Sequence, residues 1–261
     1  MLPLKISLVT VCFNSARTIE NTILSILSQQ YLHLEYIIID GGSRDGTVDI
    51  IKKFDNVDLL ISEPDKGIYD AMNKGIYHAT GDIIGFLNAD DIYAHPNVLE
   101  KVSRVFENDR LEACYGDLLY FSENQPNKVR RYWKSKPFSP GLFAKGWCPP
   151  HPTFFCRRAL YEKWGGFNLS YAMGNDVELM MRFLEKHQVI GHYIPEVLVK
   201  MRLGGASNRN ITNIIVQNKN ILKAARNLNI PISSFTFYFY KFCNRLSQFI
   251  FKPQKEYRHV E

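Results

Sequence analysis

The first ninety residues alternate between short apolar runs and amphipathic stretches, and this alternation leaves few folds open to the chain. Residues 6–13 are β-rich and apolar at almost every position, as expected of a strand covered on both faces. The next stretch carries Ile19, Ile23 and Ile26 at helical spacing. The alternation repeats as far as residue 91, which predicts an α/β fold with a mostly parallel central sheet flanked by helices.

Further elements follow from the same periodicities and from turn residues between them. Strands are expected at 36–40, 57–62, 115–120 and 193–201, and a further strand is expected to end near residue 87. Helices are expected at 68–78 and 97–106, and the run 171–176 is expected to lead into another helix.

Polar residues stand where the predicted strands of the first half end. They are Asn14, Asp40, the loop 63–67 and Asp90. Ligands of parallel α/β sheets bind beyond the carboxyl ends of the strands, so these residues are expected to share one site. The run 84–91 passes from an apolar strand into the acidic pair Asp90-Asp91, whose oxygens suit Mg²⁺ or Mn²⁺ carrying a nucleotide diphosphate. The alternative is that the pair caps or turns the chain into the next helix.

The chain's charge and cysteine content narrow the classes of partner and compartment. A net charge of +6 favours anionic partners such as nucleotide phosphates or an anionic membrane surface. No nucleic-acid-binding module is recognisable, so nucleic acid is not an expected partner. The five cysteines include no CxxC pair, which favours free thiols in a reducing compartment. Neither a signal peptide nor an apolar span of about 18 residues is recognisable.

Two segments of the second half are basic. Residues 123–136 hold five Lys and Arg residues and predict a hairpin or a mobile loop, either as a solvated edge or as a contact for an anionic acceptor or lipid headgroup. From Phe235 onward, aromatic residues fall on one helical face and polar or basic ones on the other. Such a helix can lie in a membrane interface, or it can pack its apolar face on the domain or on a partner chain.

Ordered short motifs carry a resemblance to a known family. The chain resembles an inverting family 2 glycosyltransferase of the GT-A fold, most of all bacterial enzymes that build colanic acid, O-antigen or other exopolysaccharides. Each motif alone is weak, but the ordered set covers about residues 5–205. The motifs are TVCFN (10–14), IDGGSRDGT (39–47), DKG (65–67), AMNKG (71–75), GD (81–82), FLNADD (86–91) and ND (175–176).

The resemblance implies a division of the chain. Residues 1–205 are expected to form the GT-A domain, with a nucleotide-sugar-binding half at 5–95 and an acceptor half at 96–205. Residues 206–261 are expected to form a helical C-terminal extension that contacts a membrane or packs on protein.

The resemblance also implies roles at the donor site. Asp90 is expected to hold the divalent cation as the last acid of the D-x-D motif, with Asp91 as a helper. Asn88 departs from the family's usual Asp and brings no charge. Asp40 is expected to accept a hydrogen bond from the nucleobase, either the N3–H of uracil or the N1–H and amino group of guanine. Together with the family resemblance this favours UDP over GDP. The complete set of expected donor-binding residues is Asn14, Asp40, Asp65, Asn73, Asn88, Ala89 and Asp90.

On the acceptor side, the resemblance makes Asp176 the base that removes the proton of the acceptor hydroxyl. A simple helix N-cap is the alternative for this residue. Asn175 departs from the family's usual Glu. His151 is expected either to contact the metal or diphosphate or to be structural. Gly204, Gly205 and Ser207 resemble a loop that closes over the donor.

The expected function is sugar transfer from a nucleotide-diphosphate sugar to a polyprenyl-diphosphate-linked glycan. The expected location is peripheral, at the inner face of the bacterial cytoplasmic membrane. A transferase-like scaffold without turnover is the alternative, because Asn88 and Asn175 replace acids. A dinucleotide-dependent oxidoreductase is disfavoured, since no GxGxxG follows the first strand.

Overall fold

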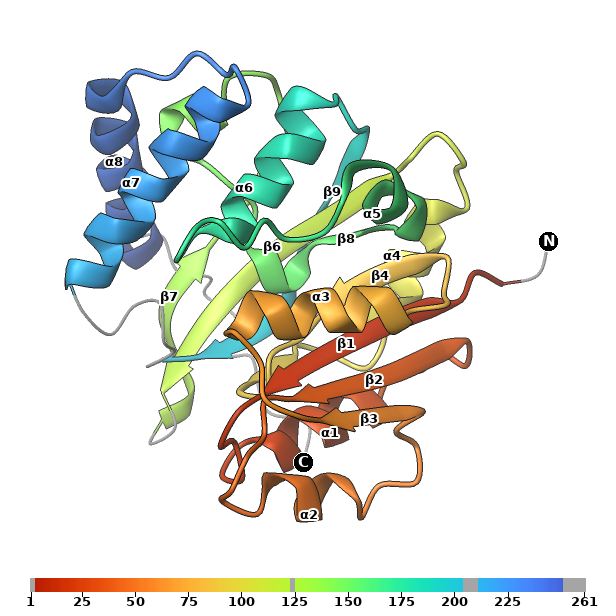
Figure 1. The fold of residues 1–261 in the computed structure, drawn as a ribbon. Helices are drawn as coiled ribbons and strands as arrows, with labels where there is room; N and C mark the ends of the chain where they lie inside the picture. Colours follow the sequence, from red (N-terminus) through yellow and green to blue (C-terminus); the bar gives the residue numbers. More distant parts are fainter. Residues whose placement is uncertain (1–2, 123–124, 204–210, 251–261) are drawn as a thin grey trace.

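The computed structural model describes residues 3–122, 125–203 and 211–250, which form one mixed sheet with helices on both faces (Figure 1). The strand order is β3-β2-β1-β4-β8-β6-β9-β5, and β7 also pairs with β6. The strands are β1 (Ile6–Cys12), β2 (Leu34–Asp40), β3 (Leu59–Ser62), β4 (Ile83–Phe86), β5 (Asp91–Tyr93), β6 (Ala113–Ser122), β7 (Gln125–Trp133), β8 (Phe155–Arg157) and β9 (Gly191–Arg202).

The helices alternate with the strands in the first half and cluster in the second. They are α1 (Ile19–Leu27), α2 (Thr47–Ile51), α3 (Ile68–His78), α4 (Val98–Phe106), α5 (Arg158–Trp164), α6 (Asn175–Met181), α7 (Ile211–Asn227) and α8 (Ser234–Ile250). Short helical turns occur at η1 (Phe143–Lys145) and η2 (His151–Thr153), and η3 (Arg182–Lys186) continues α6 as a π-helix.

The first half confirms the predicted α/β alternation. Strands β3, β2, β1 and β4 are mutually parallel, and Asp40 is in register with both Cys12 and Ser62. The carboxyl ends of three strands therefore meet at one edge of the sheet. The second half is mixed, because β8 runs antiparallel to β4 and β6, while β6 and β7 form an antiparallel pair. An antiparallel pair needs no crossover helix, so β8 pairs with β4 and β6 without one, whereas β6 and β9 pair in parallel.

The strands of the first half are buried on both faces, which explains their unbroken apolar runs. Alternate residues such as Val9 and Ile37 belong to one core, which α3 covers. Their neighbours Leu8 and Ile38 belong to a second core with residues of α1 and α4. The view in Figure 1 separates these two layers, with α3 on one side of the sheet and α1 on the other.

Two elements differ from or refine the expectations. Asp91 does not lead directly into a helix but begins β5, where it pairs with Met201 of β9. The basic segment 123–136 forms β7, so the hairpin alternative is confirmed for its described part. The predicted closing loop with Gly204, Gly205 and Ser207 lies outside the described residues.

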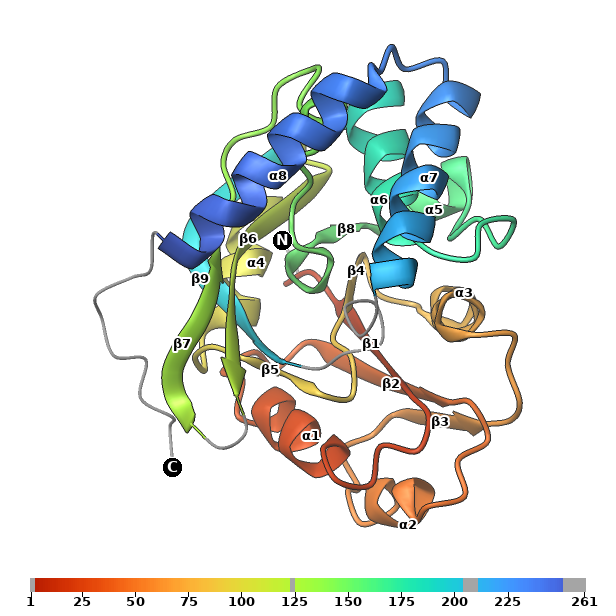
Figure 2. The same cartoon turned by 90° about the vertical axis from the view of Figure 1, so that its left-hand side faces the viewer.

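The C-terminal helix α8 packs against β7 and η1 and crosses the second half of the sheet (Figure 2). Among the described residues, no helix is both long and apolar enough to span a bilayer. Helix α8 is amphipathic, as predicted. The directions in which its two faces point matter for the site described next.

Candidate active site

The turn after β2 is organised by the carboxylate of Asp40. This side chain is fully buried and accepts hydrogen bonds from the amides of Gly42 (3.1 Å) and Ser43 (2.9 Å) and from the hydroxyl of Ser62 (2.7 Å). Burial alone would raise the pKa of Asp40, but hydrogen bonds from Ser43 and Ser62 more than offset it and keep the pKa below its ordinary value. Its contact with a nucleobase stays a prediction, since both oxygens already accept bonds from the protein.

Asp65 and Phe13 lie on either side of Gly41. A Cβ placed on Gly41 would lie 2.5 Å from Oδ2 of Asp65 and 3.4 Å from the ring of Phe13. Asp65 also accepts a hydrogen bond from the amide of Gly67 (2.7 Å), which fixes its loop. Phe13 is 62% exposed and was not predicted as a site residue. The sequence did offer a signal for Phe13, because an apolar residue there directly follows a buried strand at the ligand-binding edge of the sheet.

Asn14 ties the end of β1 to the turn after β2. Its Oδ1 accepts a hydrogen bond from the amide of Arg44 (3.0 Å), and its own amide donates to the hydroxyl of Ser43 (2.7 Å). Its φ of +50° is a left-handed conformation that asparagine tolerates better than most residues. Asn14 therefore shapes the predicted donor site, and direct donor contact stays a prediction.

The residues after β4 separate into two environments. Asn88 lines a cavity, and its Oδ1 is buried without a hydrogen-bond partner among the described residues. Ala89 is buried and Asp90 is half-buried. Asp91 is fully buried, and burial, followed by the charge of Asp90, raises the pKa of its carboxyl well above the ordinary value. Neither Asp90 nor Asp91 lines the cavity, so their predicted roles at a metal stay predictions.

A divalent cation fits this site only as a partner of the donor's phosphates. The described residues contain no cluster of three His, Cys, Asp or Glu side chains that could cage a metal. Mg²⁺ commonly takes one or two protein carboxylates and completes its shell with substrate phosphates and water. Asp90 and the unpartnered amide oxygen of Asn88 supply oxygen donors of that kind. The donor set is therefore compatible with a cation that arrives with a diphosphate.

Asp176 stands in the first turn of α6 and lines the same cavity as Asn88. Its Oδ1 accepts a hydrogen bond from the hydroxyl of Tyr69 in α3 (3.0 Å). Burial and the charge of Asp176 raise the pKa of Tyr69 well above 10, so the phenol keeps the proton that it donates. The carboxylate of Asp176 is thus oriented toward the cavity by a residue from the opposite half of the chain.

His151 also lines the cavity, from η2. Its ring lies 5.6 Å from the rings of both Phe86 and Phe167, stacked on the first and edge-on to the second. Burial lowers the pKa of His151, and the charge of Asp176 opposes this only in part. A neutral imidazole is therefore favoured at pH 7, and its contact with a metal or diphosphate stays a prediction.

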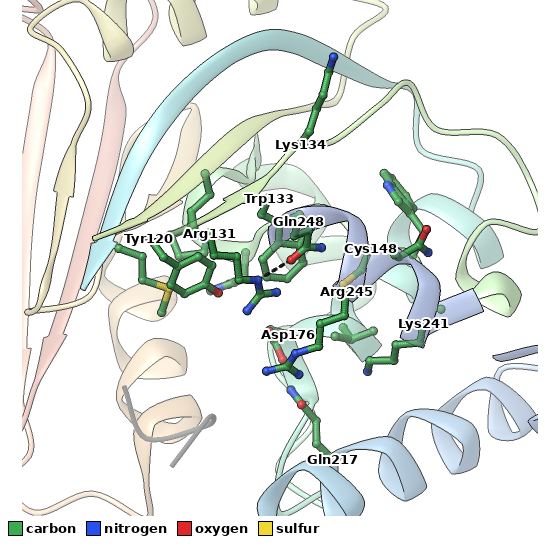
Figure 3. Close-up of a pocket in the computed structure, with 18 of the residues that line it drawn as sticks. Tyr120, Arg131, Trp133, Lys134, Cys148, Asp176, Gln217, Lys241, Arg245 and Gln248 are labelled. Carbon is green, nitrogen blue, oxygen red and sulfur yellow. Dashed lines mark hydrogen bonds between the residues drawn. The ribbon is translucent and has the colours of Figure 1, made fainter. Parts of the chain in front are cut away.

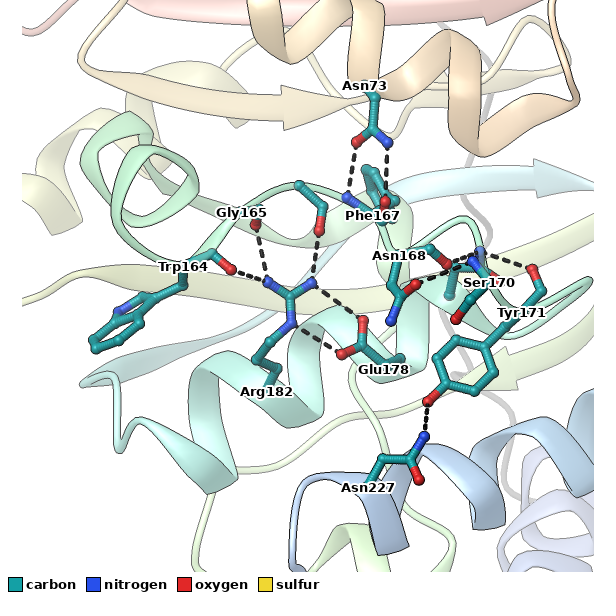
Figure 4. A network of polar contacts seen from close by, with 12 residues as sticks. Asn73, Trp164, Gly165, Phe167, Asn168, Ser170, Tyr171, Glu178, Arg182 and Asn227 are labelled. Atoms are coloured by element: carbon teal, nitrogen blue, oxygen red, sulfur yellow. Dashed lines mark hydrogen bonds and ion pairs between the residues drawn. The ribbon is translucent and has the colours of Figure 1, made fainter.

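A network of polar contacts joins α6 to the loop that precedes it (Figure 4). Arg182 donates to the carbonyls of Gly165 (3.0 Å) and Gly166 (2.6 Å) and forms an ion pair with Glu178 (2.9 Å). Asn175 is also buried, and its amide donates to two backbone carbonyls before α6. The amide at this position therefore supports the loop that leads into α6.

Asn73 belongs to the same support rather than to the cavity wall. Its Nδ2 donates to the carbonyl of Phe167 (2.9 Å), and its Oδ1 accepts from the amide of Phe167 (2.8 Å). The predicted donor contact would compete with these two bonds, and Asn73 is not among the residues that line the cavity.

The cavity has a volume of about 590 Å³ and extends from Asn88 and Asp176 to β7 and α8 (Figure 3). Its wall includes the cations Arg131, Lys241 and Arg245, which were not predicted as site residues. The amphipathic spacing of α8 was visible in the sequence, but the periodicity alone did not indicate that the basic face turns inward.

Comparison of this sequence with known proteins identifies a family that it matches. The sequence profile of glycosyl transferase family 2 matches residues 7–165. The putative glycosyltransferase EpsE of Bacillus subtilis is 29% identical over 242 residues, covering 89% of this chain and 86% of EpsE.

Two solved structures share the fold. S. aureus TarS (residues 1–349) in complex with UDP-GlcNAc has a TM-score of 0.69 at 15% identity, covering 94% of this chain and 73% of that one. The mannosyltransferase PcManGT of Pyrobaculum calidifontis, in complex with GDP-Man and Mn²⁺, has a TM-score of 0.64 at 17% identity. The match covers 94% of this chain and 70% of PcManGT. The predicted GT-A fold is confirmed.

Proposed function

This chain belongs to glycosyltransferase family 2, and from that premise we propose that it moves a sugar from a nucleotide-diphosphate sugar to a lipid-linked glycan. The observation that carries this proposal is that Asn88 and Asp176 line one cavity. A diphosphate held after β4 and an acceptor hydroxyl held at α6 would meet in that space.

The donor end would use the residues that flank the turn after β2. An exposed aromatic ring such as Phe13 can stack on a nucleobase, and Asp65 offers a carboxylate beside it. TarS binds UDP-GlcNAc and PcManGT binds GDP-Man, so both nucleotides are candidates. We favour a UDP-sugar, because Asp40 at the end of β2 suits the N3–H of uracil.

The reaction would be a single displacement with inversion at the sugar carbon. Asp176 takes the proton of the acceptor hydroxyl as its oxygen forms a bond to C1 of the sugar. The bond between C1 and the phosphate oxygen breaks, and the nucleoside diphosphate leaves. A divalent cation bound near Asp90 would neutralise the charge that develops on the leaving diphosphate.

The lipid-linked acceptor implies contact with a membrane, and α8 offers a suitable surface. Its outward face exposes Phe239 (55%), Phe242 (68%) and Ile250 (63%). Aromatic residues of this kind favour the membrane–water interface. We propose that this face rests on the inner leaflet of the cytoplasmic membrane and that the active site opens toward glycan intermediates of surface polysaccharide synthesis.

The experiment is a panel of UDP-sugars and GDP-sugars, each tested with Mn²⁺ by calorimetry. The donors that bind are then incubated with a bacterial membrane lipid extract, and the anomeric configuration of the product is read by NMR. One donor class is expected to bind and to give an inverted product. Failure of every donor to bind would refute the proposal.

A matched variant separates binding from turnover. Asp176→Asn is expected to bind the donor as the wild type does but to transfer no sugar. Full transfer by this variant would remove Asp176 as the base. Binding without transfer by the wild type, across all donors and acceptors, would favour the alternative of a nucleotide-sugar-binding scaffold, which the amides Asn88 and Asn175 suggest.

A further inference from the structure

Three cations converge on the cavity from β7 and α8. Arg131 lies on β7, and Lys241 and Arg245 lie one helical turn apart on α8. Figure 3 shows their side chains turned toward the cavity, which Lys134 and Lys136 also line. Like charges repel one another, so such a group is costly unless an anion comes to share the space.

Arg131 is built into the wall rather than left on the surface. Only 8% of it is exposed, and its guanidinium lies 4.6 Å from the ring centre of Tyr120 and 5.3 Å from that of Trp133. Its Nε donates to Oε1 of Gln248 at 2.5 Å. No described carboxylate forms an ion pair with Arg131. A buried guanidinium is normally paired with an anion, and none of the carboxylates that the structure describes takes that place here.

Lys241 shows the same pattern on the helix side. Its Nζ donates to Oδ1 of Asn218 (2.7 Å) and lies 5.1 Å from the ring centre of Phe237. No ion pair joins Lys241 to a carboxylate in the described part of the chain. Burial and the charge of Arg245 lower its pKa, while the charge of Asp176 acts in the opposite direction.

The cations and the donor-side residues come from different elements of the fold. The donor-side residues Asn88 and Asp90 follow β4, whereas these cations belong to β7 and α8. Asp176 lies in the same cavity, and its negative charge would repel an anionic acceptor. Cations on the acceptor side would offset that repulsion and leave a neutral sugar hydroxyl next to the base.

We propose that Arg131, Lys241 and Arg245 bind the phosphate or diphosphate group of the acceptor. This inference rests on the proposed function and adds the residues that would bind the phosphate group of the acceptor. Guanidinium groups bind phosphate oxygens in pairs, and an ammonium adds a point charge. Tyr120, Trp133 and Trp147 provide apolar surface beside the cations, which suits a phosphate attached to a lipid.

The test measures binding of geranyl diphosphate to the full chain by calorimetry. Saturating UDP, GDP and Mn²⁺ fill the donor site first, so that the probe reports the second site. The wild type is compared with Lys241→Gln and Arg131→Gln. Lys219→Gln is the matched control, because this lysine is exposed on α7 and does not line the cavity. Inorganic pyrophosphate is a second probe that lacks the lipid.

We expect geranyl diphosphate to bind at least ten-fold more weakly to Lys241→Gln and Arg131→Gln and unchanged to Lys219→Gln. Pyrophosphate should bind the wild type more weakly than geranyl diphosphate does. Equal affinity in wild type and Lys241→Gln, or no binding to the wild type, would overturn the inference. If Arg131→Gln does not fold, the affinity of Lys241→Gln for geranyl diphosphate alone decides whether the inference holds.

Nucleotide binding, measured separately on the same proteins, keeps the two proposals apart. Nucleotide binding without geranyl diphosphate binding would refute the acceptor site only. The opposite outcome is a protein that binds no nucleotide but binds geranyl diphosphate, with this binding lost in the variants. That outcome would refute the proposed function and would support the anion site.

Discussion

The hydroxyl of Tyr69 donates a hydrogen bond to Oδ1 of Asp176 over 3.0 Å, and this bond joins the two halves of the chain. Tyr69 belongs to α3 and Asp176 to α6. The tyrosine ring also packs against Phe167, with 5.4 Å between ring centres. The proposed base is therefore held by a residue from the half that contains the donor-side strand ends.

We expect Tyr69→Phe to lower kcat about ten-fold, because a hydrogen bond to a charged group contributes about 1.5 kcal/mol. The ring stays in place, so the donor KM should change little. Steady-state kinetics with saturating acceptor measure both constants. Tyr77→Phe is the control, because Tyr77 lies on the same helix and is 83% exposed. An unchanged kcat in Tyr69→Phe would show that the bond does not orient the base.

Arg182 and Glu178 give a second prediction, this time about stability. Their ion pair is buried, with side chains 12% and 4% exposed, and Arg182 also binds backbone carbonyls before α6. Arg182→Met would leave a buried carboxylate without its partner, so we expect the free energy of unfolding to fall by about 3 kcal/mol. Urea denaturation measures this loss.

The chain offers a control with the same spacing in an exposed position. Arg104 and Glu100 form an i,i+4 pair on α4, with side chains 67% and 38% exposed. Arg104→Met should change stability by no more than about 0.5 kcal/mol. A similar loss in both variants would show that the network around Arg182 contributes nothing beyond a surface pair.

Local patterns predicted much of the fold, and their limits are physical. The helix 68–78 has the expected bounds, β2 ends at Asp40 as expected, and β1 ends at Cys12, one residue before the expected end. Periodicity reports which face of an element is apolar, but not what covers that face. It therefore did not predict that the aromatic face of α8 is exposed while Lys241 faces the cavity.

The motif residues show a related limit. Asp40 ends β2, Asp176 stands in the first turn of α6 and Asp90 lies in the loop after β4, while their roles stay predictions. Asn73 and Asp91 belong to the same motifs, yet Asn73 binds a backbone segment 94 residues away, and Asp91 is buried at the start of β5. Such long-range contacts have no signal in a single sequence.

Glu35 gives a prediction for the acid stability of the fold. It accepts hydrogen bonds from Lys5 (2.8 Å), Ser7 (2.5 Å) and the amide of Thr80 (2.8 Å). Burial alone would raise the pKa of Glu35, but these bonds more than offset it and lower the pKa from 4.5 to about 2. Because the folded pKa lies below the unfolded one, this contribution is complete above about pH 4.5 and is lost as the pH falls toward 2.

We therefore expect Glu35→Gln to destabilise the protein by roughly 1 kcal/mol at pH 7. The difference from the wild type should shrink as the pH is lowered from 4.5. Urea midpoints measured between pH 7 and pH 3 test this. The exposed Glu107→Gln serves as the control and should remain within about 0.5 kcal/mol of the wild type at pH 7. A constant difference across the range would contradict the assigned role of Glu35.

The outward face of α8 gives the last prediction. Burying one large apolar side chain contributes about 1.5–3 kcal/mol, and Phe239 and Phe242 are both more than half exposed. If this face rests on a membrane, Phe239→Ser with Phe242→Ser should weaken sedimentation with phosphatidylglycerol–phosphatidylethanolamine vesicles at least about ten-fold. Tyr77→Ser removes a still more exposed aromatic side chain (83%) on α3 and should bind vesicles as the wild type does. The fold should not change, because both phenylalanine side chains are exposed to solvent and do not belong to the core. Equal sedimentation of the double variant and the wild type would exclude this face of α8 as the membrane contact.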